Sequence, residues 1–206
     1  MINIELEKVS KRFGNRWLLN NLSLRINESE KVAIIGHNGS GKSTLLQIIA
    51  GFIKPTKGIV YYKQNEQLIH KDDWYTNFTY AAPYMELIEE LTADEFLDFY
   101  IQHQDFMNGI TKDSFYEASD LLTSKNQIIR SFSSGMKQRF KLALSLLSAS
   151  KIVLLDEPLS NLDDTGASFY KGLIIKFAME KTMVICSNNI RDEIFCCSRE
   201  IMLDRK

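Results

Sequence analysis

Apolar and polar residues alternate near the start of the chain. The alternation covers residues 2–6 and returns at residues 22–26, where Leu22, Leu24 and Ile26 are separated by polar positions. This period of two predicts two half-buried strands, and Gly14-Asn15 predicts the turn between them. Lys31–Ile35 is a nearly continuous apolar run, typical of a strand buried on both faces.

The spacing becomes helical after this run. Apolar residues between positions 45 and 49 lie on one helical face, and Gly51 is placed to end that helix. Pro55 and Gly58 predict a turn, and Ile59–Tyr62 predicts a further strand. The first part of the chain is therefore expected to be mostly strand, with one early helix.

The middle of the chain is predicted to be helical. Thr92 with Glu95 three residues later forms a capping box ahead of an apolar stripe at residues 96–101. Asp113 is the expected cap of a second helix, and a third begins after Ser133. Strand and helix then alternate: strands are expected at 152–155, 183–186 and 201–203, and a helix around 169–179.

This pattern predicts an α/β fold with a parallel sheet, N-terminal antiparallel strands and a helical insert. We expect a core formed by residues 1–84 and 136–206, with a helical subdomain at residues 85–135. Together they would form one domain, in keeping with a length of 206 residues.

Composition narrows the possible functions. The chain has 25 basic and 26 acidic residues, so a bulk basic surface for nucleic acid is not expected. Its longest apolar runs fall well short of the roughly 18 residues of a membrane-spanning helix, and the start lacks a signal-peptide core. The three cysteines indicate free thiols in a reducing compartment. A cytoplasmic chain is therefore expected, with any membrane role supplied by a partner.

One glycine-rich segment predicts a phosphate-binding loop. It reads Gly36-His37-Asn38-Gly39-Ser40-Gly41-Lys42-Ser43 and leads into Thr44. The pattern G-x-x-x-x-G-K-[ST] between a buried strand and a helix lets backbone amides and a helix N-terminus converge on phosphate. Lys42 is expected to neutralise the β- and γ-phosphates, and Ser43 to offer its hydroxyl to magnesium.

A pair of acidic residues follows a later buried strand. Asp156 and Glu157 come directly after the apolar run at 152–155. An aspartate at the carboxyl end of such a strand can bind a magnesium ion that is also held by Ser43. Glu157, one residue further on, is the expected base that polarises water for attack on the γ-phosphate.

The segment Phe132-Ser133-Ser134-Gly135-Met136-Lys137-Gln138-Arg139 resembles the LSGGQ signature of ATP-binding-cassette (ABC) ATPases. The run from Asp156 to Asp163 is similar to that family's Walker B motif and D-loop. The resemblance extends from about Ile4 to Leu203. It implies an ABC ATPase fold, a P-loop NTPase core with the insert already described.

The resemblance also implies how the remaining site residues act. Ser133, Ser134, Gly135 and Met136 would contact the ATP bound by a second cassette, so that two chains enclose two Mg-ATP molecules. Asp163 would belong to the D-loop at that interface. An aromatic residue would stack on adenine. Phe13 occupies the matching place, and Trp17 is the alternative.

Two positions depart from the family pattern. Where the family has a glutamine after the strand at 78–81, this chain has either Pro83 or Tyr84. At the family's switch histidine stands Asn188, which can hydrogen-bond a γ-phosphate but cannot relay a proton. Because Glu157 and Lys42 are retained, we expect slower hydrolysis rather than none; alternatively, both substitutions have no kinetic effect.

The resemblance implies an ATPase subunit of an ABC transporter that binds ATP and Mg²⁺ and drives a separate membrane permease. The second cassette would be either identical or different, and the chain would lie at the inner face of the cell membrane. Two alternatives remain open. One is a regulatory cassette with little or no turnover, and the other is a soluble ABC ATPase without a transport role.

Overall fold

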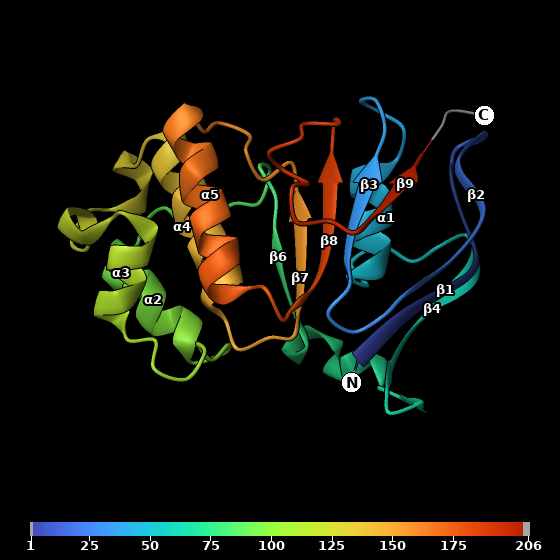
Figure 1. Ribbon diagram of the computed structural model, residues 1–206, viewed down its shortest axis with the longest axis horizontal. Coiled ribbons are helices and arrows are strands. Elements are labelled where there is room, and N and C mark those ends of the chain that lie inside the picture. Colours follow the sequence, from blue (N-terminus) through green and yellow to red (C-terminus); the bar gives the residue numbers. More distant parts are fainter. Residues whose placement is uncertain (1, 204–206) are drawn as a thin grey trace. The chain divides into compact units, whose positions relative to one another are not determined.

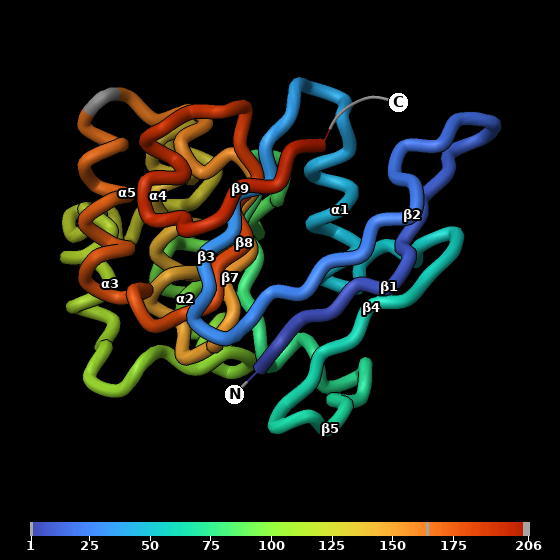
Figure 2. Tube along the Cα trace, turned by 45° about the vertical axis from the view of Figure 1, so that its right-hand side comes forward, coloured from blue at the N-terminus to red at the C-terminus, as the bar shows by residue number. Residues whose placement is uncertain are grey.

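The computed structural model describes residues 2–203, apart from the side chain of Asp164. The chain divides into two compact units. The first contains residues 1–78, 151–156 and 181–206, and the second contains residues 79–150 and 157–180. Figure 1 shows the ribbon, and Figure 2 follows the same chain from another side.

An antiparallel sheet forms the start of the first unit. Its strand order is β2-β1-β4-β5, with bounds β1 Ile2–Phe13, β2 Arg16–Ile26, β4 Lys57–Gln64 and β5 Gln67–Leu68. In Figure 2 the long strands β1, β2 and β4 run side by side. Ile2, Ile4 and Leu6 are buried along one face of β1, as the alternation predicts. A short 3₁₀ helix, η1 Lys71–Thr76, follows.

A parallel sheet forms the rest of the first unit. Its neighbouring strands are β7, β8, β3 and β9, with bounds β7 Ile152–Asp156, β8 Thr182–Ser187, β3 Lys31–Ile35 and β9 Arg199–Met202. Every residue of β3, β7 and β8 is buried, which agrees with their continuous apolar sequences. Helix α1, Lys42–Ile49, packs against β7 and β8.

The second unit is mainly helical. After strand β6, Phe78–Ala81, which lies at the boundary of the two units, come four helices and two 3₁₀ turns. Their bounds are α2 Ala93–Ile101, α3 Lys112–Ser119, η2 Leu122–Ser124, η3 Ile129–Ser131, α4 Ser134–Leu147 and α5 Asp164–Phe177. Helix α4 packs against both α3 and α5. Aromatic side chains fill this core, with Phe140 in edge contact with Phe96, Phe115 and Phe132.

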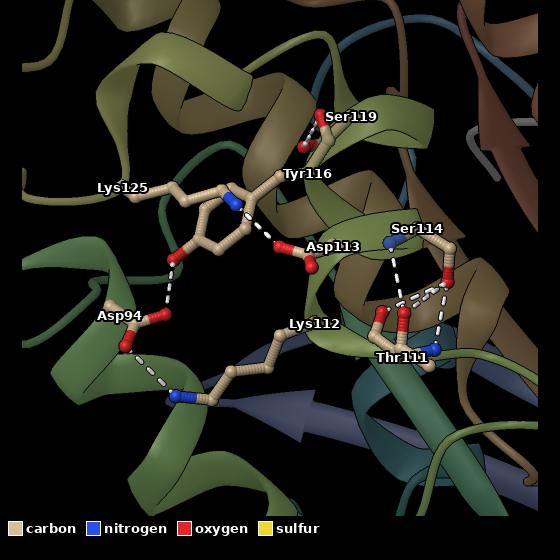
Figure 3. Close-up of polar contacts among 8 residues, drawn as sticks. All are labelled: Asp94, Thr111, Lys112, Asp113, Ser114, Tyr116, Ser119 and Lys125. Atoms are coloured by element: carbon tan, nitrogen blue, oxygen red, sulfur yellow. Dashed lines mark hydrogen bonds and ion pairs between the residues drawn. The ribbon is translucent and has the colours of Figure 1, made fainter.

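Polar contacts near α3 show how its start is fixed (Figure 3). Thr111 caps the helix by accepting a hydrogen bond from the Ser114 amide, and Ser114 returns the bond to Thr111. Lys112 binds Asp94 at 2.9 Å. The expectation that Asp113 caps this helix is therefore wrong. Asp113 lies inside the first turn, where it pairs with Lys125 at 2.5 Å.

The second unit includes more of the chain than the predicted helical subdomain at 85–135. It takes in α4, which packs on α3, and α5, which packs on α4. The expected core boundaries at residues 1 and 206 lie outside the described residues. Within residues 2–203, the structure contains no helix with the length and apolar character needed to cross a bilayer.

Candidate nucleotide-binding site

The loop between β3 and α1 is folded as a tight cradle. Gly39 and Gly41 have φ angles of 78° and 106°, in the left-handed region that glycine adopts without strain. The Ser40 amide donates to the His37 carbonyl at 3.1 Å, which closes the loop. A Cβ atom added to Gly36 would lie 2.5 Å from Ser40 Oγ and 2.7 Å from the Leu203 carbonyl. This backbone therefore accepts only glycine at position 36.

Helix α1 begins with an N-terminus that suits an anion. Gly41 is its N-cap and supplies no side-chain hydrogen bond, and the first turn contains no acidic residue. The first amides of a helix lack partners within the helix, and the helix dipole places partial positive charge there. Ser43 and Thr44 lie in this first turn. The loop and helix together offer backbone donors of the kind that bind phosphate.

Lys42 is the first residue of α1 and is only 4% exposed. Its Nζ atom donates to the Gly36 carbonyl at 2.8 Å, to the His37 carbonyl at 3.2 Å and to Asn188 Oδ1 at 2.8 Å. All three acceptors are neutral. Within the described part of the chain, no carboxylate lies within ion-pair distance of this ammonium group. An uncompensated buried charge is costly, so an anionic ligand is the missing counter-charge that this site favours.

Two oxygen donors of the first unit fit a hard divalent cation. Asp156 ends β7 and is 1% exposed, and Ser43 follows the loop lysine on α1. Carboxylate and hydroxyl oxygens are ligands that magnesium prefers, and it commonly keeps several waters besides. A buried carboxylate at the carboxyl end of a parallel strand is where such a cation is held in this class of fold. The donor chemistry therefore fits Mg²⁺.

Asn188 follows the end of β8 and contacts Lys42. Its neighbour Ser187 is buried, and the Ser187 hydroxyl donates to the fully buried carboxylate of Glu193. The same hydroxyl accepts from the Ile190 amide at 3.0 Å, closing the turn that contains Asn188. Sequence reasoning missed Glu193. Its sequence context, two charged residues before it and two apolar residues after it, does not predict burial.

Both aromatic candidates for adenine stacking lie on the β1–β2 hairpin. Phe13 is 52% exposed and Trp17 is 39% exposed. Lys11 lies 5.0 Å from the Phe13 ring, whereas Arg12 and Lys57 lie 5.5 and 5.4 Å from the Trp17 ring. Cation–π contacts of this kind hold exposed rings in place. The geometry leaves both rings available, and Phe13 remains the proposed residue.

The predicted signature residues begin α4 in the second unit. Ser133 is the N-cap, and its hydroxyl accepts from the Met136 amide at 3.1 Å. The first turn contains no acidic residue, and Ser134 is exposed. An ideal Cβ on Gly135 would lie 3.4 Å from the Asn161 carbonyl, an ordinary contact distance. The segment thus presents a second helix N-terminus, with no acidic residue in its first turn, of the kind that suits an anion.

Glu157 and Asp163 flank the loop that leads into α5. Glu157 has a φ of 43°, a left-handed conformation that costs a non-glycine residue energy and often marks a functional position. Asp163 caps α5 by accepting from Thr165 Oγ1 at 2.6 Å and from the Gly166 amide at 2.9 Å. These two bonds, the Thr165 bond first, lower the pKa of the Asp163 carboxyl. Its capping role was not foreseen.

The segment after β6 contains both candidates for the missing glutamine. Tyr84 is exposed and its hydroxyl bonds that of Tyr80, while Pro83 lies beside it in the chain. Sequence reasoning overlooked Lys141, a buried lysine of α4 that binds the backbone of this segment. The available signal was a lysine between the apolar residues Phe140 and Leu142 of a helix. This pattern alone predicts a side chain directed to solvent.

Comparison with known proteins places the chain among ABC proteins. The model of the ABC transporter family matches residues 19–160. The zinc import ATP-binding protein ZnuC of Rickettsia bellii is 30% identical over 208 residues, covering 96% of this chain and 84% of that protein. The ATP-binding cassette sub-family A member 2 of Rattus norvegicus is 27% identical over 190 residues, which are 90% of this chain. This chain spans only 8% of that longer relative.

The fold is also found in solved cassettes. The dimeric structure of the bacterial ABC transporter cassette MJ0796 superimposes with a TM-score of 0.81 at 27% identity, covering 97% of this chain and 94% of that one. A second dimeric structure of MJ0796, in a post-hydrolysis state bound to ADP and Pi, gives 0.80 at 25% identity, covering 98% and 94%. With a family match over more than half its length, the chain belongs to the ABC transporter family as an ATP-binding subunit.

Proposed function

We propose that this subunit hydrolyses ATP and couples the reaction to a separate membrane permease. The observation that carries the proposal is the state of Lys42, a buried ammonium group bound by three neutral acceptors at the uncapped start of α1. A triphosphate supplies the negative charge that this arrangement lacks. We propose that the loop residues 36–44 bind the phosphates and that Phe13 stacks on adenine.

Ser43 and Asp156 would hold the magnesium ion. Bound there, the ion neutralises charge on the phosphate oxygens and fixes their position. The chain's own contribution is to present a buried carboxylate and a helix-borne hydroxyl with little freedom to reorient. Preorganised groups of this kind lose little entropy when the substrate binds, which favours the bound state.

Glu157 is the proposed general base. It would hold the attacking water and accept its proton as the bond to the γ-phosphorus forms and the bond to the ADP oxygen breaks. Its left-handed backbone is held by the turn in which the Ser160 amide donates to the Glu157 carbonyl at 2.9 Å. Asn188 is proposed to bind a γ-phosphate oxygen through Nδ2, its donor group, while Oδ1 accepts from Lys42.

We further propose that Mg-ATP brings two cassettes together. Ser133, Ser134, Gly135 and Met136 would bind the γ-phosphate held by the second subunit, through the start of α4. Asp163, which caps α5, would lie in the D-loop at the same interface. The dimeric structures of MJ0796 support this assembly. The permease would place the complex at the cytoplasmic face of the membrane.

Phosphate release by the purified chain tests the proposal. The chain should release phosphate from Mg-ATP, and Glu157→Gln should reduce the rate strongly while retaining ATP binding, because the substitution removes only the base. A matched control is Glu117→Gln, which changes an acidic residue of α3, a helix that contributes none of the proposed binding groups. Loss of binding in Glu157→Gln, or equal rates for the two variants, would contradict the assigned role.

One observation favours a second candidate function, a regulatory cassette with little turnover. Asn188 stands at the expected switch position with its acceptor oxygen on Lys42, and a carboxamide cannot relay a proton. Such a cassette would bind and dimerise around ATP without releasing phosphate. Measuring binding and phosphate release on the same preparation separates the two candidates.

A further inference from the structure

Lys141 makes an unusual set of contacts inside the second unit. Its side chain is on α4, between the fully buried Phe140 and Leu142, and is itself only 5% exposed. The Nζ atom donates to the Ala82 carbonyl at 2.8 Å, to the Pro83 carbonyl at 3.0 Å and to the Met85 carbonyl at 3.4 Å. Burial, and to a smaller extent the charge of Lys137, lowers the pKa of Lys141.

The segment that Lys141 binds has few backbone hydrogen bonds of its own. Pro83 has no amide hydrogen to donate. The Met85 amide donates to the Ala82 carbonyl at 3.1 Å, so that this carbonyl accepts from both Met85 and Lys141. Carbonyls left without partners in a buried position are costly. A three-donor ammonium group therefore fixes a stretch of backbone that neither a helix nor a strand would hold.

A second lysine, one helical turn earlier on α4, holds the chain a few residues after this segment. Lys137 forms an ion pair with Glu89, whose carbonyl also accepts from the Arg130 amide at 3.0 Å. Residues four apart lie on one helix face. Lys137 and Lys141 thus attach residues 82–89 to α4 at both ends, while Tyr84 between them stays exposed.

Helix α4 also contacts a second segment, the loop between Glu157 and α5. The side-chain amide of Gln138 donates through Nε2 to the Pro158 carbonyl at 2.8 Å, and an ideal Cβ on Gly135 would lie 3.4 Å from the Asn161 carbonyl. One helix therefore carries the proposed signature residues at its start and contacts two segments along its sides. Residues 82–89 and the loop after Glu157 are therefore connected through the helix that begins with the proposed signature residues.

We propose that Lys141 is a positioning residue that fixes the 82–85 backbone to α4, so that displacement of this segment is transmitted to the signature residues. The ammonium group of Lys141 sets the place of this segment through its backbone. The inference rests on the proposed ATPase function for its kinetic consequence. The attachment itself does not depend on that function.

Amide hydrogen exchange of the full chain, followed by NMR, tests the attachment directly. Lys141→Met keeps a long apolar side chain but removes the three donors. The Met85 amide should then exchange about ten- to a hundredfold faster, the effect of losing a charge-assisted bond. The Phe96 amide, which donates to Thr92 in α2, should keep its rate and so report that the unit is folded. An unchanged Met85 rate would overturn the proposal.

The matched control is Lys125→Met, which removes an exposed ion pair with Asp113 in the same unit (Figure 3). It should leave the Met85 amide unchanged; acceleration equal to that of Lys141→Met would overturn the local role. In phosphate release, Lys141→Met should lower kcat at unchanged KM for ATP, because the loop residues 36–44 are untouched. Lys141→Arg, which can donate to the same carbonyls, should restore part of kcat.

A lowered kcat with no restoration by arginine, or a raised KM alone, would overturn the transmission role. If the unaltered chain releases no phosphate, the proposed function fails, and the exchange of the Met85 amide still decides whether Lys141 holds the segment. The two failures are therefore distinguishable.

Discussion

Replacing Lys42 with methionine removes one buried charge and nearly preserves side-chain volume. In the unliganded chain the ammonium group has three neutral hydrogen-bond acceptors and no carboxylate partner among the described residues. Two changes then oppose one another, since the substitution relieves a buried charge and leaves the Gly36 and His37 carbonyls without this donor. We therefore expect a small change in the melting temperature of the unliganded protein.

In nucleotide binding, by contrast, the loss of the Lys42 charge is not offset by an opposing change. A charge-assisted contact contributes about 1.5–3 kcal/mol, so Lys42→Met should weaken ATP affinity roughly ten- to a hundredfold. At an ATP concentration one hundred times Kd, binding stabilises the unaltered chain by about 2.7 kcal/mol, which raises the melting temperature by about 5–10 °C for a protein of this size. After a hundredfold loss of affinity the same concentration gives about 0.4 kcal/mol and a shift of about 1 °C.

Thermal unfolding with and without ATP, together with titration calorimetry, measures both quantities. The matched control is Lys31→Met, another buried lysine of the first unit that lies outside the loop. This control should keep the ATP-induced shift. An unchanged shift in Lys42→Met would refute the account of Lys42 as the phosphate-binding lysine, and an equal loss in the control would attribute the effect to folding.

Three further outcomes are expected. Asp156→Asn should weaken ATP binding more in the presence of magnesium than in its absence, as measured by calorimetry; equal losses would make Asp156 structural. Asn188→Ala should slow phosphate release about ten- to a hundredfold, whereas Asn188→His should change it modestly without a new pH dependence near 6.5. Because hydrogen bonds lower the pKa of Asp163, its contribution to stability is present above the unfolded carboxyl pKa of about 4 and is lost as pH falls through the folded value. Asp163→Ala should therefore lower the melting temperature at pH 7 and have less effect near pH 2, as thermal scans would measure.

Local sequence patterns were sufficient to predict the structure where each residue's environment depends on residues close to it in the chain. The continuous apolar run Lys31–Ile35 became a strand with every residue buried. The Thr92–Glu95 capping box formed as its spacing predicts, with both reciprocal bonds present. The loop at 36–43 adopted left-handed glycines, because the glycine pattern reflects backbone conformation directly.

Long-range contacts were not predictable in this way. Asp113 and Thr111 are both acceptable caps by residue type; Thr111 is the cap, and Asp113 instead pairs with Lys125, twelve positions away. Lys141 and Glu193 have polar side chains whose burial depends on backbone brought in from distant positions. Nothing in a single helix or turn specifies such partners.

The mass of the Glu157→Gln chain in Mg-ATP, measured by light scattering, tests the central claim most directly. The substitution leaves the proposed binding groups in place and removes the base, so ATP should accumulate between two signature segments. The account predicts a particle of twice the 23.7 kDa chain mass with Mg-ATP and a single chain without nucleotide. A single chain under both conditions, in a sample that calorimetry shows to be saturated with ATP, would contradict the proposed dimer in its form with two identical cassettes.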